Sequence, residues 1–204
     1  MKKLFLICLL ITSCITFAQN NSKRKKCNCD RLTEVENTWF LKDEAFNGTC
    51  TAKYPNGKLL CKIKFRKGLI VGKVKKYYNN GNLREATVYK NGVPNGSVKY
   101  YFDNGKPSQI GQVANDIKIG TWKTFHLNGK VKAVEYFKNG VLEGKVVNYA
   151  PNGKIQLKGR FKNGKEEGKW VFYNTYNGDI QKVLYYRNGD IVETQQMTPK
   201  FTTL

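Results

Sequence analysis

Histidine and acidic residues are scarce in this sequence of 204 residues. It contains one histidine, His126, and 15 aspartates and glutamates against 36 lysines and arginines. A catalytic histidine needs a nucleophile or a carboxylate placed for it, and the sequence around His126 offers neither. The glycines also lack the spacing of a phosphate-binding loop or a dinucleotide-binding turn. These absences favour a protein that is not an enzyme and that carries no cofactor.

The shortage of acidic residues leaves a formal net charge of +21 at pH 7. Such a strong positive charge predicts an acidic partner. Beyond the N-terminal region, no apolar run approaches the ~20 residues that a membrane-spanning helix requires. We therefore expect a mature chain that is soluble or held to a membrane by a lipid.

The N-terminus has the features of an export signal. Two lysines precede an apolar stretch, and Thr16-Phe17-Ala18 forms a small-x-small cleavage site. This order predicts a secretory signal peptide over residues 1–18, and export to the periplasm or the cell surface. In the alternative interpretation, residues 11–14 form a lipobox and Cys14 becomes the lipidated first residue of the mature chain.

Four cysteines follow the export signal: Cys27, Cys29, Cys50 and Cys61. An even number of cysteines in an exported chain predicts disulfides. Cys50 and Cys61 lie on successive predicted strands, where a four-residue turn would place them opposite each other, so this is the preferred bridge. Cys27 and Cys29 belong to a basic lead-in over residues 19–29, and would pair with each other or with a partner outside the chain. A zinc site of four thiolates is the alternative.

A glycine recurs every 24 residues, at Gly48, Gly72, Gly96, Gly120, Gly144 and Gly168. Two further turns follow in each unit, most of them written Asn-Gly. Asn-Gly between alternating apolar and polar runs predicts a β-hairpin, because both residues tolerate the positive φ of a tight reversal. A single hairpin is marginal in water, whereas six stacked repeats over residues 48–191 would stabilise one another.

The segments around the repeats are less regular. Residues 30–47 predict a degenerate N-terminal cap repeat, and residues 192–204 a C-terminal cap or tail. At ~4.8 Å between strands, six repeats would extend over roughly 55 to 60 Å. We therefore predict an all-β, single-domain, elongated array of about six 24-residue antiparallel β-hairpin repeats, without a deep enclosed core.

The order glycine, aromatic residue, Asn-Gly, lysine is seen over Gly120–Lys130, and an aromatic residue precedes a further Asn-Gly over Tyr136–Gly140. This register resembles the bacterial variant of the MORN (membrane occupation and recognition nexus) repeat over residues 48–191. The resemblance implies a protein of the YwqK-type antitoxin or immunity group of toxin–antitoxin modules. Eukaryotic relatives of the repeat imply phospholipid binding and scaffolding. The export signal departs from the picture of a cytoplasmic antitoxin.

Two sets of side chains are candidates for partner binding. One is a set of repeated aromatic residues: Tyr77, Tyr101, Trp122, Phe125, Tyr149, Trp170 and Tyr173. The other is a set of lysines that follow the middle turn of the unit: Lys58, Lys106, Lys130 and Lys154. Such lysines would stand ~10 Å apart and form a basic stripe, which also suits the protection of sheet edges.

The leading hypothesis is an exported antitoxin-like or immunity-like protein that binds an acidic, toxin-like protein through its lysine-edged aromatic face. The alternative is a cell-envelope scaffold that binds anionic lipid or glycan through the basic stripe. Basic and aromatic surface together also suits single-stranded nucleic acid, but export makes nucleic acid the least expected partner.

Overall fold

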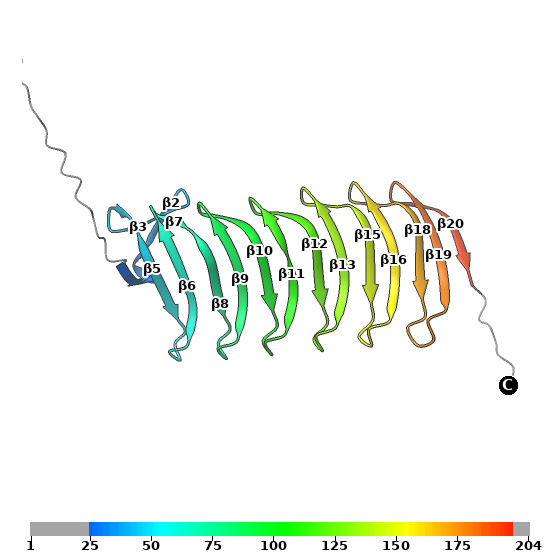
Figure 1. Cartoon of the computed structure of the whole chain (residues 1–204), viewed down its shortest axis with the longest axis horizontal. Helices are drawn as coiled ribbons and strands as arrows, with labels where there is room; N and C mark the ends of the chain where they lie inside the picture. Colours follow the sequence, from blue (N-terminus) through cyan, green and yellow to red (C-terminus); the bar gives the residue numbers. More distant parts are fainter. Residues whose placement is uncertain (1–24, 198–204) are drawn as a thin grey trace, which may run out of the picture.

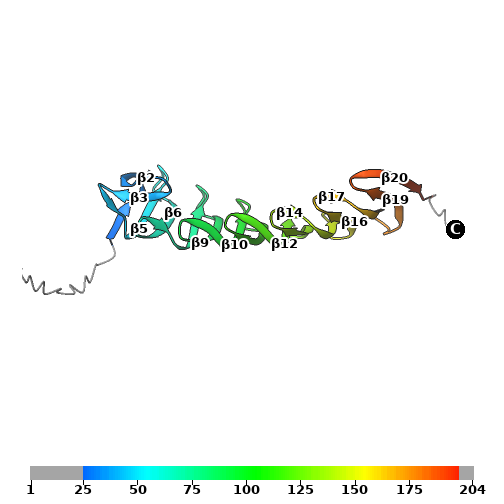
Figure 2. The same cartoon turned by 90° about the horizontal axis from the view of Figure 1, so that it is seen from above.

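The computed structural model describes residues 25–197, and within them nearly all regular structure is β (Figure 1). The strands lie side by side in a long sheet that is almost wholly antiparallel. Figure 2 shows the same chain along its strands, as a thin and elongated layer. The predicted signal peptide, the lipobox cysteine Cys14 and the end of the predicted tail lie outside the described residues. Within the described part, no helix is long and apolar enough to cross a membrane.

Six hairpins form the array. Their strands are β5 (Gly48–Lys53) and β6 (Leu59–Arg66), β8 (Gly72–Tyr77) and β9 (Leu83–Lys90), β10 (Val93–Tyr101) and β11 (Pro107–Ala114), β12 (Ile117–Phe125) and β13 (Val131–Lys138), β15 (Gly144–Tyr149) and β16 (Ile155–Lys162), and β18 (Gly168–Tyr173) and β19 (Ile180–Arg187). Each hairpin also pairs with the next one, so a single ladder runs from β5 to β20 (Asp190–Gln196). The all-β prediction and the array of 24-residue hairpins are confirmed.

Each repeat after the first bends at its leading glycine. In three repeats a two-residue strand precedes the bend: β7 (Leu69–Ile70), β14 (Val141–Leu142) and β17 (Lys165–Glu166). At the bend between β7 and β8, Phe65 opposes Ile70 and Lys62 opposes Lys75, so two residues of β6 face four residues at the junction of β7 and β8. Every leading glycine after Gly48 has a positive φ, from 63° at Gly120 to 130° at Gly96, which residues with a side chain rarely adopt. The extra residues and the glycine conformation together bend the strand.

The two turns of each repeat differ in their backbone. In the linking turn, which joins one hairpin to the next, both central residues have positive φ, as at Asn139 (50°) and Gly140 (81°). In the inner turn, within a hairpin, only the glycine does, as at Gly129 (92°). The asparagine of that inner turn, Asn128, uses its side chain instead. Its Oδ1 accepts from the Lys130 N–H at 2.9 Å, and its Nδ2 donates to a carbonyl of the next repeat at 2.8 Å.

A cap covers the N-terminal end of the array. It consists of β1 (Lys25–Asn28), which pairs in parallel with β5, the 3₁₀ turn η1 (Cys29–Arg31), and a separate sheet of β2 (Thr33–Val35), β3 (Thr38–Leu41) and β4 (Glu44–Ala45). Trp39 and Phe46 of the cap segment pack against Phe65 of β6, with ring centroids 5.9 and 5.6 Å from it. At the opposite end, β20 pairs with β19 alone among the described strands.

The disulfide joins Cys29 to Cys50, with Cα atoms 4.9 Å apart, and Cys27 and Cys61 are free. Both predicted pairings, Cys50–Cys61 and Cys27–Cys29, are therefore wrong. The bond also removes two of the four thiolates that the alternative zinc site required. Burial raises the pKa of the Cys27 thiol, against the opposing charge of Arg31.

The register of the first hairpin explains why Cys50 and Cys61 do not meet. Cys50 opposes Ile63, whereas Cys61 opposes Ala52. The inner turn ends with a hydrogen bond from the Tyr54 N–H to the Lys58 carbonyl, and a bulge in β6 follows it. A turn of five residues plus one bulged residue displaces the pairing by two positions from that of a four-residue turn.

Successive side chains on a strand point to opposite faces of the sheet, and one face holds most of the buried residues. This apolar face contains the clusters Val98, Val113 and Trp122, and Val146, Trp170 and Leu184. Each tryptophan covers a glycine of the preceding strand. A Cβ atom on Gly111 would lie within 3.0 Å of three Trp122 ring atoms, and one on Gly159 equally close to Trp170. These glycines therefore make room for the indoles.

Candidate partner-binding surface

The middle of the opposite face carries ten basic side chains on strands β6 to β18. We call this region the lysine face and define it by Lys62, Lys64, Lys73, Lys75, Lys99, Lys123, Lys145, Lys158, Arg160 and Lys169. All ten are exposed. They alternate with residues of the apolar face, as Lys73 and Lys75 flank the buried Val74. Because opposed residues share a face, the strand register places the ten in two adjacent rows across the sheet.

These two rows hold no acidic side chain between β6 and β18. Like charges that are directly opposed destabilise a sheet, yet Lys62 opposes Lys75, and Lys145 opposes Arg160. The two ion pairs among the described residues join Lys25 to Glu44 and Lys76 to Glu85, away from the ten. Within the described chain, none of the ten basic side chains of the lysine face therefore takes part in an ion pair.

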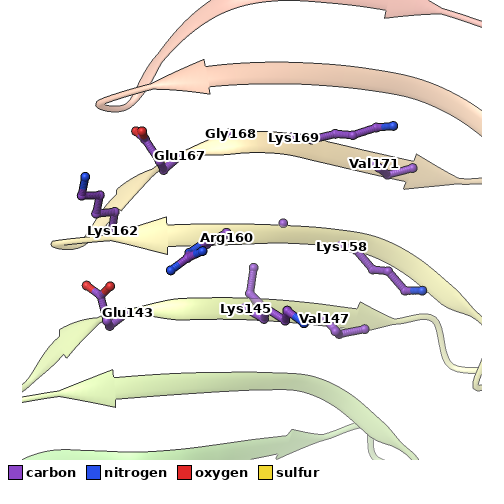
Figure 3. A pocket seen from close by; sticks show the side chains of 12 residues that line it. Glu143, Lys145, Val147, Lys158, Arg160, Lys162, Glu167, Gly168, Lys169 and Val171 are labelled. Carbon is purple, nitrogen blue, oxygen red and sulfur yellow. The ribbon is translucent and has the colours of Figure 1, made fainter.

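The lysine face is hollowed near its C-terminal end (Figure 3). This open hollow, of about 830 Å³, lies over β15, β16 and β18 and is lined by five basic side chains: Lys145, Lys158, Arg160, Lys162 and Lys169. Glu143 and Glu167 lie at its linking-turn end. Each carboxylate accepts a hydrogen bond at 2.9 Å from a backbone N–H of the next linking turn. Both are thus engaged by the fold, and the basic side chains dominate the hollow.

Five of the predicted aromatic residues border the lysine face: Tyr77, Tyr101, Phe125, Tyr149 and Tyr173. Each stands at the inner-turn end of its strand and is partly buried. Alternation along the strand puts Tyr77 on the same face as Lys75. The Lys158 Nζ lies 5.6 Å from the ring centroid of Tyr173, within the range of a cation–π contact. The lysine face therefore has an aromatic border along one side.

Trp122 and Trp170 do not reach this surface, so their prediction as partner-binding residues is wrong. They are 1% and 6% exposed. Their rings make edge contacts with Phe137 and Phe161, at centroid distances of 6.3 and 5.1 Å. In every repeat, the side chain two residues after the leading glycine points to the apolar face. The alternating sequence pattern shows that successive residues face opposite sides, but it does not show which side is buried.

The lysines predicted as a binding stripe hold neighbouring inner turns together. Their Nζ atoms donate to backbone carbonyls 22 residues further on, from Lys58 to Asn80 (2.9 Å), Lys106 to Asn128 (3.0 Å), Lys130 to Asn152 (2.7 Å), and Lys154 to Tyr176. An ammonium group fixed in this way keeps its charge but is directed at the next repeat. The freely presented positive charge lies instead on the strands of the lysine face.

His126 makes the same kind of contact between repeats. Its Nε2 lies 2.8 Å from the carbonyl oxygen of Tyr149. At the equivalent position of earlier repeats, the hydroxyls of Tyr54 and Tyr78 each donate to a carbonyl of the next repeat at 2.7 Å. The histidine therefore occupies a structural position of the repeat. Across residues 25–197, no three side chains of metal-binding type lie together.

Five stretches of the chain match the family described as MORN repeat variant, over residues 46–67, 70–91, 94–115, 118–139 and 142–163. Five stretches of 22 residues amount to 110 of the 204 residues. The chain belongs to the MORN repeat variant family. MORN repeats are typically binding modules, and the sixth hairpin, β18–β19, continues their pairing beyond the matched stretches. No curated protein matches the chain.

Proposed function

We propose that this MORN repeat protein is an exported, non-enzymatic binding module that captures an acidic protein through its lysine face, in the manner of an antitoxin or immunity protein. The observation that carries the proposal is the positive charge of this face: ten exposed basic side chains stand in two adjacent rows without an acidic residue, and none of them takes part in an ion pair of the described chain. An acidic surface laid on these rows would relieve the repulsion between opposed lysines. It would also be attracted from a distance by the net charge of the chain.

Two other features support the proposal. The disulfide between Cys29 and Cys50 is typical of proteins that fold in an oxidising compartment outside the cytosol. The aromatic border of the lysine face offers rigid contact area, and tyrosine is enriched at protein interfaces. These features are consistent with an exported protein that binds an acidic partner.

A pull-down from envelope extract tests this function. The mature chain is immobilised beside a variant with Lys75→Glu, Lys99→Glu, Lys123→Glu and Lys158→Glu. A matched control carries Lys42→Glu, Lys67→Glu, Lys90→Glu and Lys138→Glu, which changes the net charge equally on exposed lysines of the cap and the linking-turn edge. We expect a saturable protein partner on the mature chain and the control, and its loss from the lysine-face variant. A pull-down without a saturable partner, or equal capture by both variants, would contradict the proposal.

An anionic surface is the second candidate partner, because the lysine face is spread over strands from β6 to β18 and would fit an envelope scaffold that holds lipid or glycan. Its test is sedimentation with vesicles of anionic lipid and with acidic glycan, at ~50 and 300 mM salt. Binding by surface charge must weaken as salt screens it. Sedimentation that salt leaves unchanged would rule out this candidate.

A further inference from the structure

One row of the lysine face crosses the sheet in an unbroken register. Each member opposes the next: Lys62, Lys75, Ala86, Lys99, Ile110, Lys123, Val134, Val147, Lys158, Val171 and Val183. We call this the central row. Every member is a lysine or an aliphatic residue, so the row combines positive charge with an apolar floor.

Three lysines of the central row recur with the period of the array. Lys75, Lys99 and Lys123 each follow a leading glycine by three residues. Successive members are two strands apart, which is about 9.6 Å at ~4.8 Å per strand. All three are exposed and lie outside both ion pairs. Between them lie Ala86, which is 7% exposed, and the partly buried Ile110. The lysines therefore stand at regular intervals above aliphatic side chains.

This spacing discriminates between conformations of a bound segment. A polyproline II helix returns to the same side every three residues, after about 9.3 Å, so it drifts from the lysines by only ~0.6 Å over two repeats. An α-helix returns every seven residues, after about 10.5 Å, and drifts by ~1.8 Å. In a β-strand, successive side chains point to opposite sides. Of three carboxylates placed at every third residue, the middle one would therefore point away from the row.

We propose that the acidic partner presents an extended segment in the polyproline II conformation, with a carboxylate at every third residue, and that this segment lies along the central row. The inference rests on the proposed function and names the part of the partner that is bound. Its carboxylates would pair with Lys75, Lys99 and Lys123, and the residues between them would contact Ala86 and Ile110. Such a segment crosses the strands, so it needs no free strand edge.

Three peptides that each carry three glutamates test this inference. The first is Glu-Pro-Ala repeated three times, the second has the same nine residues with the glutamates adjacent, and the third is a helical peptide of alanine and glutamine with glutamate at every seventh position. Affinity for the full mature chain is measured by fluorescence anisotropy at low salt. We expect the first peptide to bind about fivefold more tightly than the second, because more exposed ion pairs form in register.

Two variants of equal net charge locate the site. Lys75→Gln, Lys99→Gln and Lys123→Gln together should abolish the preference for the first peptide. Arg66→Gln, Lys90→Gln and Lys138→Gln, which lie on the same side of the sheet but near the linking turns and outside the lysine face, should leave the preference intact. Circular dichroism on both variants checks that they are folded.

The results separate this inference from the proposed function. Equal binding of the first two peptides, tighter binding of the helical peptide, or no binding of any peptide would overturn the extended segment. The pull-down with the glutamate variants would still decide whether an acidic protein binds the lysine face. A preference that survives the loss of the three central lysines would also overturn the inference.

Discussion

The apolar face and the lysine face are formed by alternate residues of the same strands, but their contacts differ in kind. On the apolar face, large side chains are covered by the neighbouring repeat, as the indole of Trp122 lies over Gly111. On the lysine face, exposed cations oppose one another without an acidic neighbour in their rows. In a sheet of one layer, the first arrangement stabilises the array and the second weakens it. The comparison therefore assigns stability to the apolar face and is consistent with the proposed binding role of the lysine face.

Side-chain volume on the apolar face is matched between successive repeats. A tryptophan stands at Trp122 and Trp170, and each follows a glycine by eleven residues, Gly111 and Gly159. The equivalent valines, such as Val98, follow larger residues instead, such as Thr87. Interiors are close-packed, so the two positions must change together.

Loss of the disulfide should have the largest effect of the changes considered. Cys29 and Cys50 lie 21 residues apart, and closing a loop of this size stabilises the folded state by about 3 kcal/mol in the chain-entropy account. We expect Cys29→Ser to lower the free energy of unfolding by about this amount, as measured by urea denaturation. Cys27→Ser is the control, because Cys27 is free. Equal stability of the two variants would show that the bond contributes little to holding the cap.

Overpacking beneath a tryptophan should come next. Gly111→Val would force a side chain into space that the Trp122 ring occupies, and overpacking of this kind destabilises by about 1–3 kcal/mol. The double variant with Trp122→Val recreates a pair of the kind found at Thr87 and Val98. We expect it to be more stable than the sum of the two single changes predicts, by at least ~1 kcal/mol in a double-mutant cycle. Simple additivity would contradict the volume matching.

Most of the fold could be predicted from the sequence because its determinants are local. The 24-residue glycine period and the Asn-Gly turns are repeated six times, and each copy predicts the same reversal. The disulfide could not be predicted in this way. It depends on β1 docking in parallel beside β5 from outside the repeats, and on a bulge that displaces the register of Cys61.

The candidate site was harder to predict than the fold, because contacts between repeats decide which residues are free. The ammonium of Lys130 donates a hydrogen bond to a backbone carbonyl of the next repeat. Every residue has a backbone carbonyl, so the sequence does not indicate which one is the acceptor. Two signals were readable. The glycines Gly111 and Gly159 fall outside the period and each precedes a tryptophan, and lysine recurs at the third position after the leading glycine, as at Lys99. Charge counted position by position within the repeat would have found the central row.

The lysines of the inner turns should have an intermediate effect on stability. Lys130→Met removes the hydrogen bond to the Asn152 carbonyl while keeping most of the aliphatic stem. We expect a loss of about 1 kcal/mol, as for a hydrogen bond made by a charged group at an exposed site. Lys132→Met, at an exposed position of the adjoining strand, should change the free energy of unfolding by less than ~0.5 kcal/mol. Thermal unfolding of the two variants checks this prediction. A lower midpoint temperature for Lys130→Met than for Lys132→Met would support it, and equal midpoints would contradict it.

Neutralising the central row should have the smallest effect on stability and so sharpens the comparison of the two faces most. Lys75→Gln, Lys99→Gln and Lys123→Gln remove three charges that have no acidic partner in the described chain, and Lys75 is directly opposed by Lys62. Relief of like-charge repulsion favours the folded state, so the free energy of unfolding should stay within ~0.5 kcal/mol of the wild-type value or rise. The same variant should lose its acidic partner in the pull-down. A clear decrease in the free energy of unfolding would contradict this expectation. It would show that the three lysines stabilise the sheet.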